Sequence, residues 1–296
     1  MNDHSARFEL LTDVRPCLIR VVVFDFDGTL SLLRTGWQAV MIDLMQETLQ
    51  AAGAGEPEAA LRARLRELVD QSTGRQTIDQ MQMLVELVRQ AGASPAAAAQ
   101  YKELYLKRLN DHMLLRLKAI ASGVPTDQFL VAGARGFLNW LGNRGVTMCL
   151  ISGTDESAVI EEVQLLGIAQ YFAGRIFGGL NETGAFTKLD AMRRVLAAQG
   201  AAPEATVTFG DGMMDVRSAR ELGALAVGVA SDEERGCGWD ERKRRLLAQA
   251  GAQIIIGDYI GFELWIDKLI QGSGVRGQGS GVLDRTLPCS CTCTCS

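Results

Sequence analysis

Residues 18–30 read Leu-Ile-Arg-Val-Val-Val-Phe-Asp-Phe-Asp-Gly-Thr-Leu, and this stretch decides the fold. Residues 19–25 are apolar and β-branched, which predicts a strand buried on both faces, as in a parallel sheet. Asp25 ends this strand and Asp27 follows it. In an extended chain the two carboxylates would face opposite sides. One site can use both only if the chain turns, and Gly28 permits that turn.

Strand and helix patterns alternate again after Pro125. Expected helices lie near residues 134–143, 155–166, 188–199, 216–222 and 262–270, and expected strands near residues 146–151, 175–177, 206–209, 224–229 and 253–256. This alternation predicts an α/β fold with a Rossmann-like, mostly parallel sheet and right-handed crossovers. In such sheets, ligands bind beyond the carboxyl ends of the strands.

A helical segment interrupts this alternation directly after the first strand. Alanine, leucine and charged residues recur there with helical spacing, and clusters of glycine and proline separate the helices. We therefore expect an inserted α-helical cap domain at residues 33–128, placed over the ligand-binding edge of the sheet. The α/β core would then consist of residues 18–32 and 129–271.

The composition limits the class of protein and its partners. The chain has 296 residues, of which 47% are hydrophobic and 22% charged, so most of it should fold. A net charge of -5 argues against a nucleic-acid footprint. The first sixteen residues lack the apolar core of a signal peptide, and no apolar run approaches the roughly 20 residues that span a bilayer. We expect a soluble, cytoplasmic protein with a small-molecule partner, no nucleic acid and no membrane contact; the sequence leaves its oligomeric state open.

Residues 272–296 differ from the rest of the chain. They are rich in glycine, and Cys289, Cys291, Cys293 and Cys295 crowd into the last eight residues. The cysteine spacing could bind a soft metal, but it lacks the loop of a structural zinc site, and it is no disulfide framework. A disordered tail is the expectation for this segment.

The paired aspartates at the end of the first strand indicate phosphoryl chemistry. The carboxylate of Asp25 can attack phosphorus and form an aspartyl phosphate, which divides one difficult displacement into two easier ones. Asp27 can protonate the leaving oxygen and later deprotonate water. Alone, the pair could equally form a turn or cap a helix, so the hypothesis depends on companion motifs elsewhere in the chain.

The strand-end Asp-x-Asp-Gly-Thr resembles the first motif of the haloacid dehalogenase-like (HAD) superfamily, and the resemblance covers residues 18–271. Ser152 and Gly153 match the second motif, in which a hydroxyl and backbone amides hold the phosphoryl group. Lys188 matches the third, in which a lysine offsets the charge between nucleophile and phosphoryl oxygens. The dehalogenases of the superfamily lack the second aspartate, so Asp27 implies phosphoryl transfer.

Asp211 and Asp215 match the fourth motif, the acidic loop that holds magnesium in the superfamily. The resemblance implies Mg²⁺ held by the carboxylate of Asp25, the backbone carbonyl of Asp27 and the carboxylate of Asp211. Asp215 would support the metal directly or through water. Hard oxygen ligands suit this ion. Gly212 stands where relatives often carry serine, so the outer hydrogen bonds of the family cannot be transferred.

The loop Ser72–Thr77 joins two predicted helices of the insert. Relatives with helical caps often recognise substrate through such a loop, so Arg75 is a candidate substrate-binding residue for an anionic or hydroxylated group. The alternative is a plain helix start, capped by Thr73 or Thr77, with Arg75 solvated. Arg34, near the hinge that leaves the first motif, has similar standing.

Together the motifs predict a magnesium-dependent phosphatase that hydrolyses a small phosphorylated metabolite, such as a sugar phosphate, through an aspartyl-phosphate intermediate. A phosphomutase would use the same two aspartates but return the phosphate to its substrate. A binding protein that keeps the fold without turnover is the second alternative. The motifs do not identify the substrate, because the loops of the cap determine it.

Overall fold

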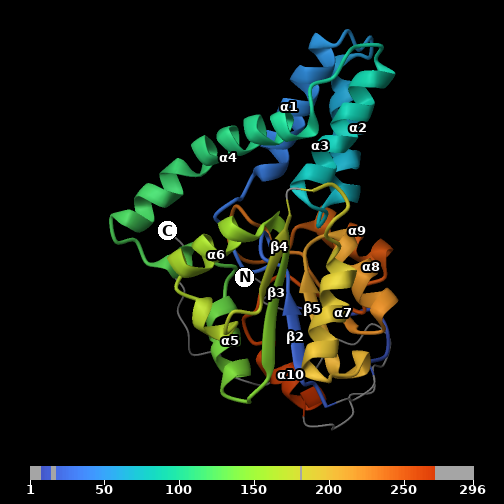
Figure 1. Cartoon of the computed structure of the whole chain (residues 1–296). Helices are drawn as coiled ribbons and strands as arrows, with labels where there is room; N and C mark the ends of the chain where they lie inside the picture. The colour runs from blue at the N-terminus through green and yellow to red at the C-terminus, as the bar shows by residue number, and fades with distance from the viewer. Residues whose placement is uncertain (1–7, 15–17, 181, 271–296) are drawn as a thin grey trace, which may run out of the picture.

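The computed structural model describes residues 8–14, 18–180 and 182–270 (Figure 1). Within these residues the strands form a seven-stranded sheet with the order β1-β7-β6-β5-β2-β3-β4. Neighbouring strands are parallel except β1 and β7, so the mostly parallel α/β sheet expected from the sequence is confirmed. The strands are β1 (Phe8–Leu10), β2 (Val21–Phe24), β3 (Thr147–Asp155), β4 (Ile176–Gly179), β5 (Thr206–Gly210), β6 (Leu225–Val229) and β7 (Ile254–Ile256).

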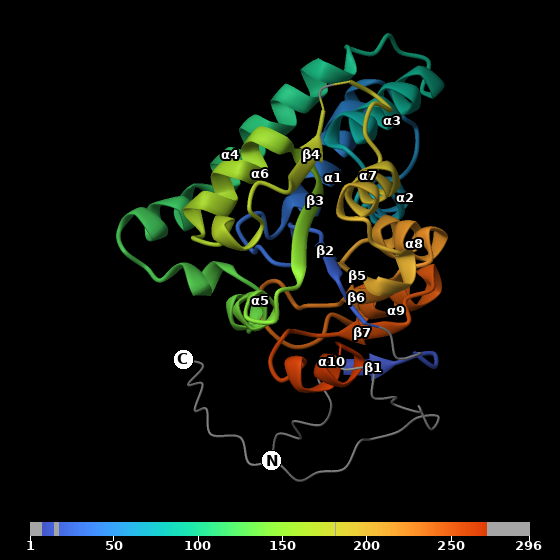
Figure 2. The same cartoon turned by 60° about the horizontal axis from the view of Figure 1, so that its bottom comes forward.

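Helices cover both faces of the sheet (Figure 2). Buried side chains of α5, α6 and α10 share one hydrophobic cluster with one face of β2, whereas α7, α8 and α9 pack against the opposite face of the sheet. These helices are α5 (Ala134–Gly142), α6 (Glu156–Leu165), α7 (Lys188–Gln199), α8 (Met213–Leu222), α9 (Glu241–Ala250) and α10 (Glu263–Ile270).

The central strand β2 is buried on both faces, which explains its uninterrupted apolar sequence. On one face the ring of Phe24 stacks on Phe209 with centroids 5.0 Å apart and meets the edge of Phe137 at 6.2 Å. On the other face Val23 packs in a cluster with Met192 of α7. A polar side chain in this strand would be removed from water on whichever face it lay, which costs free energy. The apolar sequence therefore fits a central strand that is covered on both faces.

The register of β2 aligns the ends of three strands. Phe24 lies opposite Leu150 of β3 and opposite Phe209 of β5. The N–H of Asp25 continues the ladder, donating to the carbonyl of Phe209 at 2.8 Å. The residues that follow these positions therefore meet at one edge of the sheet, and they carry the first, second and fourth motifs.

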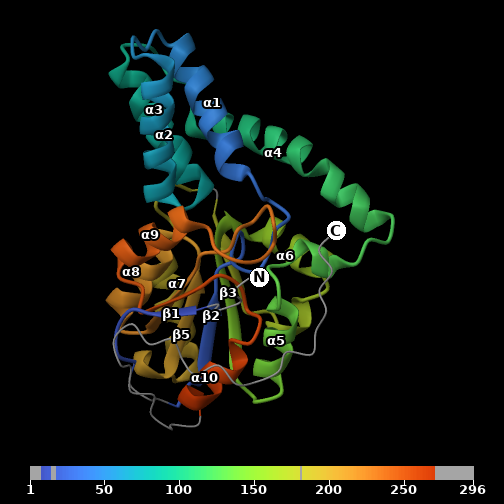
Figure 3. The same cartoon turned by 180° about the vertical axis from the view of Figure 1, so that it is seen from behind.

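Four helices inserted between β2 and β3 stand beyond this edge (Figures 1 and 3). They agree with the helical insert expected from the sequence. The long helix α4 slants back towards α6, and its buried Lys102 contacts Asp155 at the end of β3, with 2.6 Å between Nζ and Oδ1. The helices are α1 (Trp37–Ala51), α2 (Glu58–Ser72), α3 (Thr77–Gln90) and α4 (Ala98–Ala121).

Two elements were not expected from the sequence. Strand β1 lies before the predicted start of the core at residue 18 and pairs with β7. It is three residues long, half-buried and interrupted by Glu9, so it lacks a strand pattern. In α9 only Leu247 is buried, so the sequence has no apolar stripe that would predict this helix. The expected tail at residues 272–296 lies outside the described residues. No helix in the described ranges is long and apolar enough to cross a membrane.

Candidate active site

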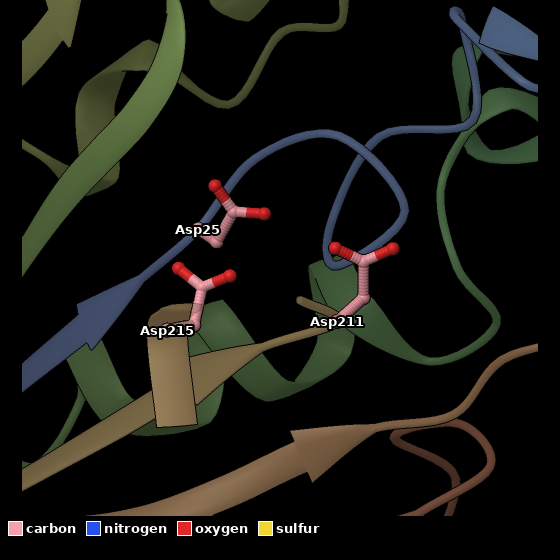
Figure 4. Close-up of side chains that lie close together, drawn as sticks. All are labelled: Asp25, Asp211 and Asp215. Atoms are coloured by element: carbon pink, nitrogen blue, oxygen red, sulfur yellow. The ribbon is translucent and has the colours of Figure 1, made fainter. Parts of the chain in front are cut away.

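Three carboxylates from the first and fourth motifs meet at the carboxyl edge of the sheet. Asp25 follows β2, Asp211 follows β5, and Asp215 lies in the first turn of α8. One carboxylate oxygen from each lies within 4.8 Å of the others, and all three residues are buried (Figure 4). The strand register brings these predicted site residues together although 190 positions separate Asp25 from Asp215.

Lys188 joins two of these carboxylates. Its Nζ donates to Oδ1 of Asp25 and to Oδ1 of Asp215, each at 2.5 Å. The Thr187 hydroxyl caps α7 by accepting the N–H of Asp190, so Lys188 opens that helix and its side chain lies under the strand ends. Burial alone would lower the pKa of Lys188, but the carboxylates of Asp215 and Asp25 outweigh it and raise the pKa. The lysine therefore stays cationic in a buried position.

Asp27 has two unlike carboxylate oxygens. Oδ2 accepts a hydrogen bond from the Thr154 hydroxyl at 2.6 Å. Oδ1 is buried without a hydrogen-bond partner among the described residues, and Arg34 Nε lies 3.6 Å away. Burial raises the pKa of Asp27 to about 7, against the lowering effect of Arg34 and with a further increase from Glu162. This carboxyl group can therefore bind and release a proton near neutral pH.

Negative charge exceeds positive charge at this edge. Burial raises the pKa of Asp25 to about 6 despite Lys188, and that of Asp211 to about 6 despite Lys243. Three cations each contact two carboxylates, so six carboxylates face three cations: Lys188 with Asp25 and Asp215, Lys243 with Asp211 and Glu233, and Arg34 with Asp27 and Glu162. Buried, oxygen-rich and under-neutralised, this donor set fits a hard divalent cation.

The second motif lies in β3 beside these carboxylates. Ser152 is buried, and its Oγ accepts the N–H of Thr154 at 3.1 Å. An added Cβ at Gly153 would lie 2.3 Å from the carbonyl oxygen of Arg75, so only glycine fits under the loop of the insert. Both residues line the same pocket as Asp25 and Lys188.

The loop of the insert reaches the site with its backbone. Gly74 has a positive φ of 96°, and a Cβ there would lie 3.1 Å from Asp215 Oδ2. A Cβ at Gly212 would lie 2.8 Å from the Thr73 carbonyl oxygen. A larger residue at position 212 would therefore push the loop away from the strand end.

Arg75 lines the pocket, and its side chain is exposed. The expected helix cap by Thr73 or Thr77 is not found, whereas the solvated Arg75 of that alternative stays open. Thr73 donates to the carbonyl of Val69 instead of capping α3, whose N-cap is Gln76 without a side-chain cap bond. Instead the Gln76 side chain ties the loop to the core, accepting the N–H of Leu180 at 2.7 Å.

The sequence named Arg34 as a candidate but gave no signal for its partners, and it gave none for the place of Lys243 or Tyr105 in the site. Arg34 is buried, and its Nη2 lies 2.6 Å from Oε1 of Glu162 on α6. Nothing local predicts a pair 128 positions apart. Lys243 lies in a run of basic residues that is typical of a solvated helix face. The insert also lines the pocket with Tyr105, whose pKa is raised by burial.

Comparison with known proteins agrees with this geometry. The sequence profile described as haloacid dehalogenase-like hydrolase matches residues 19–223, more than half of the chain. The chain belongs to the haloacid dehalogenase-like hydrolases. The match includes all four motifs and the whole helical insert.

Among curated HAD-like relatives, a phosphoglycolate phosphatase from Synechococcus elongatus is 24% identical over 211 residues, which cover 71% of this chain and 84% of the relative. Among solved structures, a predicted phosphoglycolate phosphatase from Haemophilus somnus has a TM-score of 0.54 at 16% identity, covering 85% of this chain and 99% of that one. A β-phosphoglucomutase from Clostridium difficile has a TM-score of 0.54 at 13% identity, covering 86% and 98%. The solved structures establish a shared fold.

Proposed function

We propose that this hydrolase is a magnesium-dependent phosphatase that removes phosphate from a small phosphorylated metabolite through an aspartyl phosphate on Asp25. One observation carries the proposal. The Asp25 carboxylate ends a buried strand 2.5 Å from Lys188, in the same pocket as an Asp27 oxygen without a hydrogen-bond partner among the described residues. A nucleophile, a neutralising cation and a proton donor thus share one site.

The two aspartates would divide the reaction between them. Asp25 attacks phosphorus, forming a P–O bond while the bond to the leaving oxygen breaks. Asp27 supplies the proton to that oxygen from Oδ1, because Thr154 occupies Oδ2. In the second step the ionised Asp27 takes a proton from water as the water oxygen attacks phosphorus and releases Asp25. A pKa raised to about 7 suits a group that must both give and take a proton.

The phosphoryl group would be held by residues around Asp25. Lys188 lies beside the nucleophile. It would offset the negative charge on the phosphoryl oxygens while the phosphoryl group is transferred to and from the Asp25 carboxylate. The Ser152 hydroxyl and the Gly153 amide come from the adjacent strand end and would donate to the same oxygens. These donors are preorganised, because β3 and α7 fix their backbones.

Asp25, Asp211 and Asp215, with the backbone carbonyl of Asp27, would hold Mg²⁺. When bound, the cation would neutralise part of the charge on the phosphoryl oxygens. The excess of carboxylates over cations at this edge supports the assignment.

The helical insert would act as the cap, over residues 33–128, with hinges where the chain leaves and re-enters beside the first motif. Its loop already rests on Gly153 and Gly212 through backbone atoms. Arg75, on the same loop, would meet the part of the substrate that is not the phosphate. Closure of this kind excludes water from the first step.

Release of inorganic phosphate from a panel of phosphorylated metabolites, phosphoglycolate and sugar phosphates among them, tests the proposal. Turnover should require magnesium, stop in chelator and return when magnesium is restored. A phosphomutase would convert sugar phosphates between isomers with little phosphate released, so product isomers are measured in the same samples. A protein that binds these compounds but changes none of them would overturn the proposal.

A further inference from the structure

A second lysine contacts the candidate metal site from the other end of the chain. Lys243 Nζ lies 2.8 Å from Oδ2 of Asp211 and 2.5 Å from Oε1 of Glu233. The three side chains are 14%, 3% and 9% exposed. None of the four motifs includes Lys243 or Glu233, so the pair has no role in the reaction described above.

The position of Lys243 is unfavourable for its own helix. It lies in the first turn of α9, where the Asp240 side chain caps the helix by accepting the N–H groups of Arg242 and Lys243. Cations are disfavoured at this positive end of the helix dipole. Arg242 shares this unfavourable turn but contacts Asp70 of the insert, so what distinguishes Lys243 is that it points into the acidic site.

The surrounding loop leaves this pair little freedom. The Ser231 hydroxyl donates to the carbonyl of Gly28 at 2.9 Å, which fastens the segment after β6 to the turn of the first motif. A Cβ at Gly28 would lie 2.2 Å from Asp211 Oδ2 and 2.9 Å from Glu233 Oε1. Both acceptors of Lys243 are thus packed against that turn.

Each of the three metal-site carboxylates has one oxygen bound to a lysine. Lys188 contacts Oδ1 of Asp25 and Oδ1 of Asp215, and Lys243 contacts Oδ2 of Asp211. Each carboxylate then has one oxygen that no lysine contacts; that of Asp215 accepts the N–H of Gly212 at 3.2 Å, and that of Asp211 would be left to bind a cation as a single ligand. Mg²⁺ requires six ligands in near-octahedral order, whereas Ca²⁺ takes six to eight and often binds both oxygens of a carboxylate.

We propose that Lys243, held by Glu233, restricts Asp211 to one ligating oxygen and so makes the site select Mg²⁺ over Ca²⁺. The inference rests on the metal site of the proposed function. Removing the ammonium group releases Asp211 Oδ2 and leaves the Glu233 carboxylate without a cation beside the site. The released Asp211 oxygen would add a ligand, and the uncompensated Glu233 charge would let the loop relax; both changes favour the larger ion with its higher coordination number.

Calorimetric titration of the full chain with Mg²⁺ and with Ca²⁺ tests this, using wild type, Lys243→Met and Arg242→Met. Arg242 is the matched control, because its loss changes the charge equally in the same helical turn while its guanidinium contacts Asp70. Outer-sphere changes typically alter metal affinity by 10- to 100-fold. We expect the ratio of Ca²⁺ to Mg²⁺ affinity to rise about tenfold in Lys243→Met and to stay unchanged in Arg242→Met.

Thermal melting in each cation gives a second readout that does not depend on turnover. An unchanged affinity ratio in folded Lys243→Met, or an equal change in Arg242→Met, would overturn the inference. If Lys243→Met does not fold, Lys243→Gln replaces it, and a shift in the same direction is expected, because a neutral amide holds the carboxylate more weakly. Wild type that binds neither cation would refute the metal site itself, an outcome distinct from bound metals with an unaltered ratio.

Discussion

The strand edge of the core and the loop Ser72–Thr77 of the insert meet at one site but contribute to it differently. The core contributes buried side chains, with Asp25 and Asp215 joined by Lys188. The loop contributes backbone, with the Arg75 carbonyl against Gly153, while the Arg75 side chain is exposed. The nucleophile and its cation are therefore held by the sheet and its helices, and this loop mainly supplies shape.

Removal of the nucleophile should have the largest effect. Asp25→Asn preserves the shape of the side chain but cannot form the aspartyl phosphate, so turnover should fall by about 10⁴ or more, with the thermal midpoint retained. Phosphate release and thermal melting measure the two effects. The sample needs a mass check for deamidation, and parent-like turnover in an intact Asp25→Asn variant would contradict the assignment.

A substitution at Gly153 tests the contact between the strand edge and the loop. An alanine at Gly153 would place Cβ 2.3 Å from the Arg75 carbonyl, so the loop must move away. We expect kcat/KM to fall roughly 10- to 100-fold, as for a displacement near 1 Å in a catalytic site. Gly136→Ala is the control, because its Cβ meets nothing within 4 Å. Equal activity of the two variants would mean that the loop contact is not needed.

The buried carboxylates of the core should make the stability of the fold depend on pH. Asp25 and Asp211 have a pKa raised to about 6 in the folded state, and Asp27 to about 7, against an ordinary 3.8. The fold therefore binds protons that the unfolded chain releases, and the stabilisation present below about pH 4 is lost as pH rises through 6 to 7.

In chelator, the thermal midpoint should fall by several degrees between pH 5 and pH 8, and magnesium should restore it at pH 8. Asp211→Asn removes one of the buried charges, so the midpoint of that variant should depend less on pH. A midpoint that rises over this range in wild type would exclude buried, under-neutralised carboxylates.

The smallest effect is expected from the insert side chain. Arg75→Ala should change kcat/KM several-fold and by different factors for different phosphorylated substrates, because an exposed arginine recognises the leaving group without taking part in bond breaking. Arg89→Ala is the control, since this exposed arginine of the same insert pairs with Glu86 instead. A uniform loss over all substrates, or no change, would leave Arg75 as a solvated residue.

Much of the core side of the site was predictable. The apolar, β-branched run before Asp25 favoured a doubly buried strand, and parallel strands present their carboxyl ends at one edge. Ser152 and Asp211 follow predicted strands, and Lys188 begins a predicted helix. Their meeting at one edge was expected from that alternation together with the resemblance of the four ordered motifs to the HAD superfamily.

The outer contacts were not predictable. Arg34 and Glu162 belong to different elements, and an arginine beside a hinge has the same sequence pattern whether it is buried or solvated. Lys243 lies in a helix with one buried residue, so its sequence has the pattern of a surface segment. Strand β1 has three residues and includes Glu9, so it is too short and too polar to show the apolar pattern of a strand.

By itself the sequence determined the α/β core, the helical insert and the motif residues at the strand ends. Burial of both sheet faces and the turn at Gly28 are local requirements, so each segment shows them in its own pattern of residues. Only the tertiary structure decided which charges face one another: three cations shared among six carboxylates, and a loop of the insert resting on Gly153. The physical reason is that burial and ion pairing between distant segments depend on how the elements pack, and a charged side chain looks the same in the sequence whether it lies in water or in a buried site.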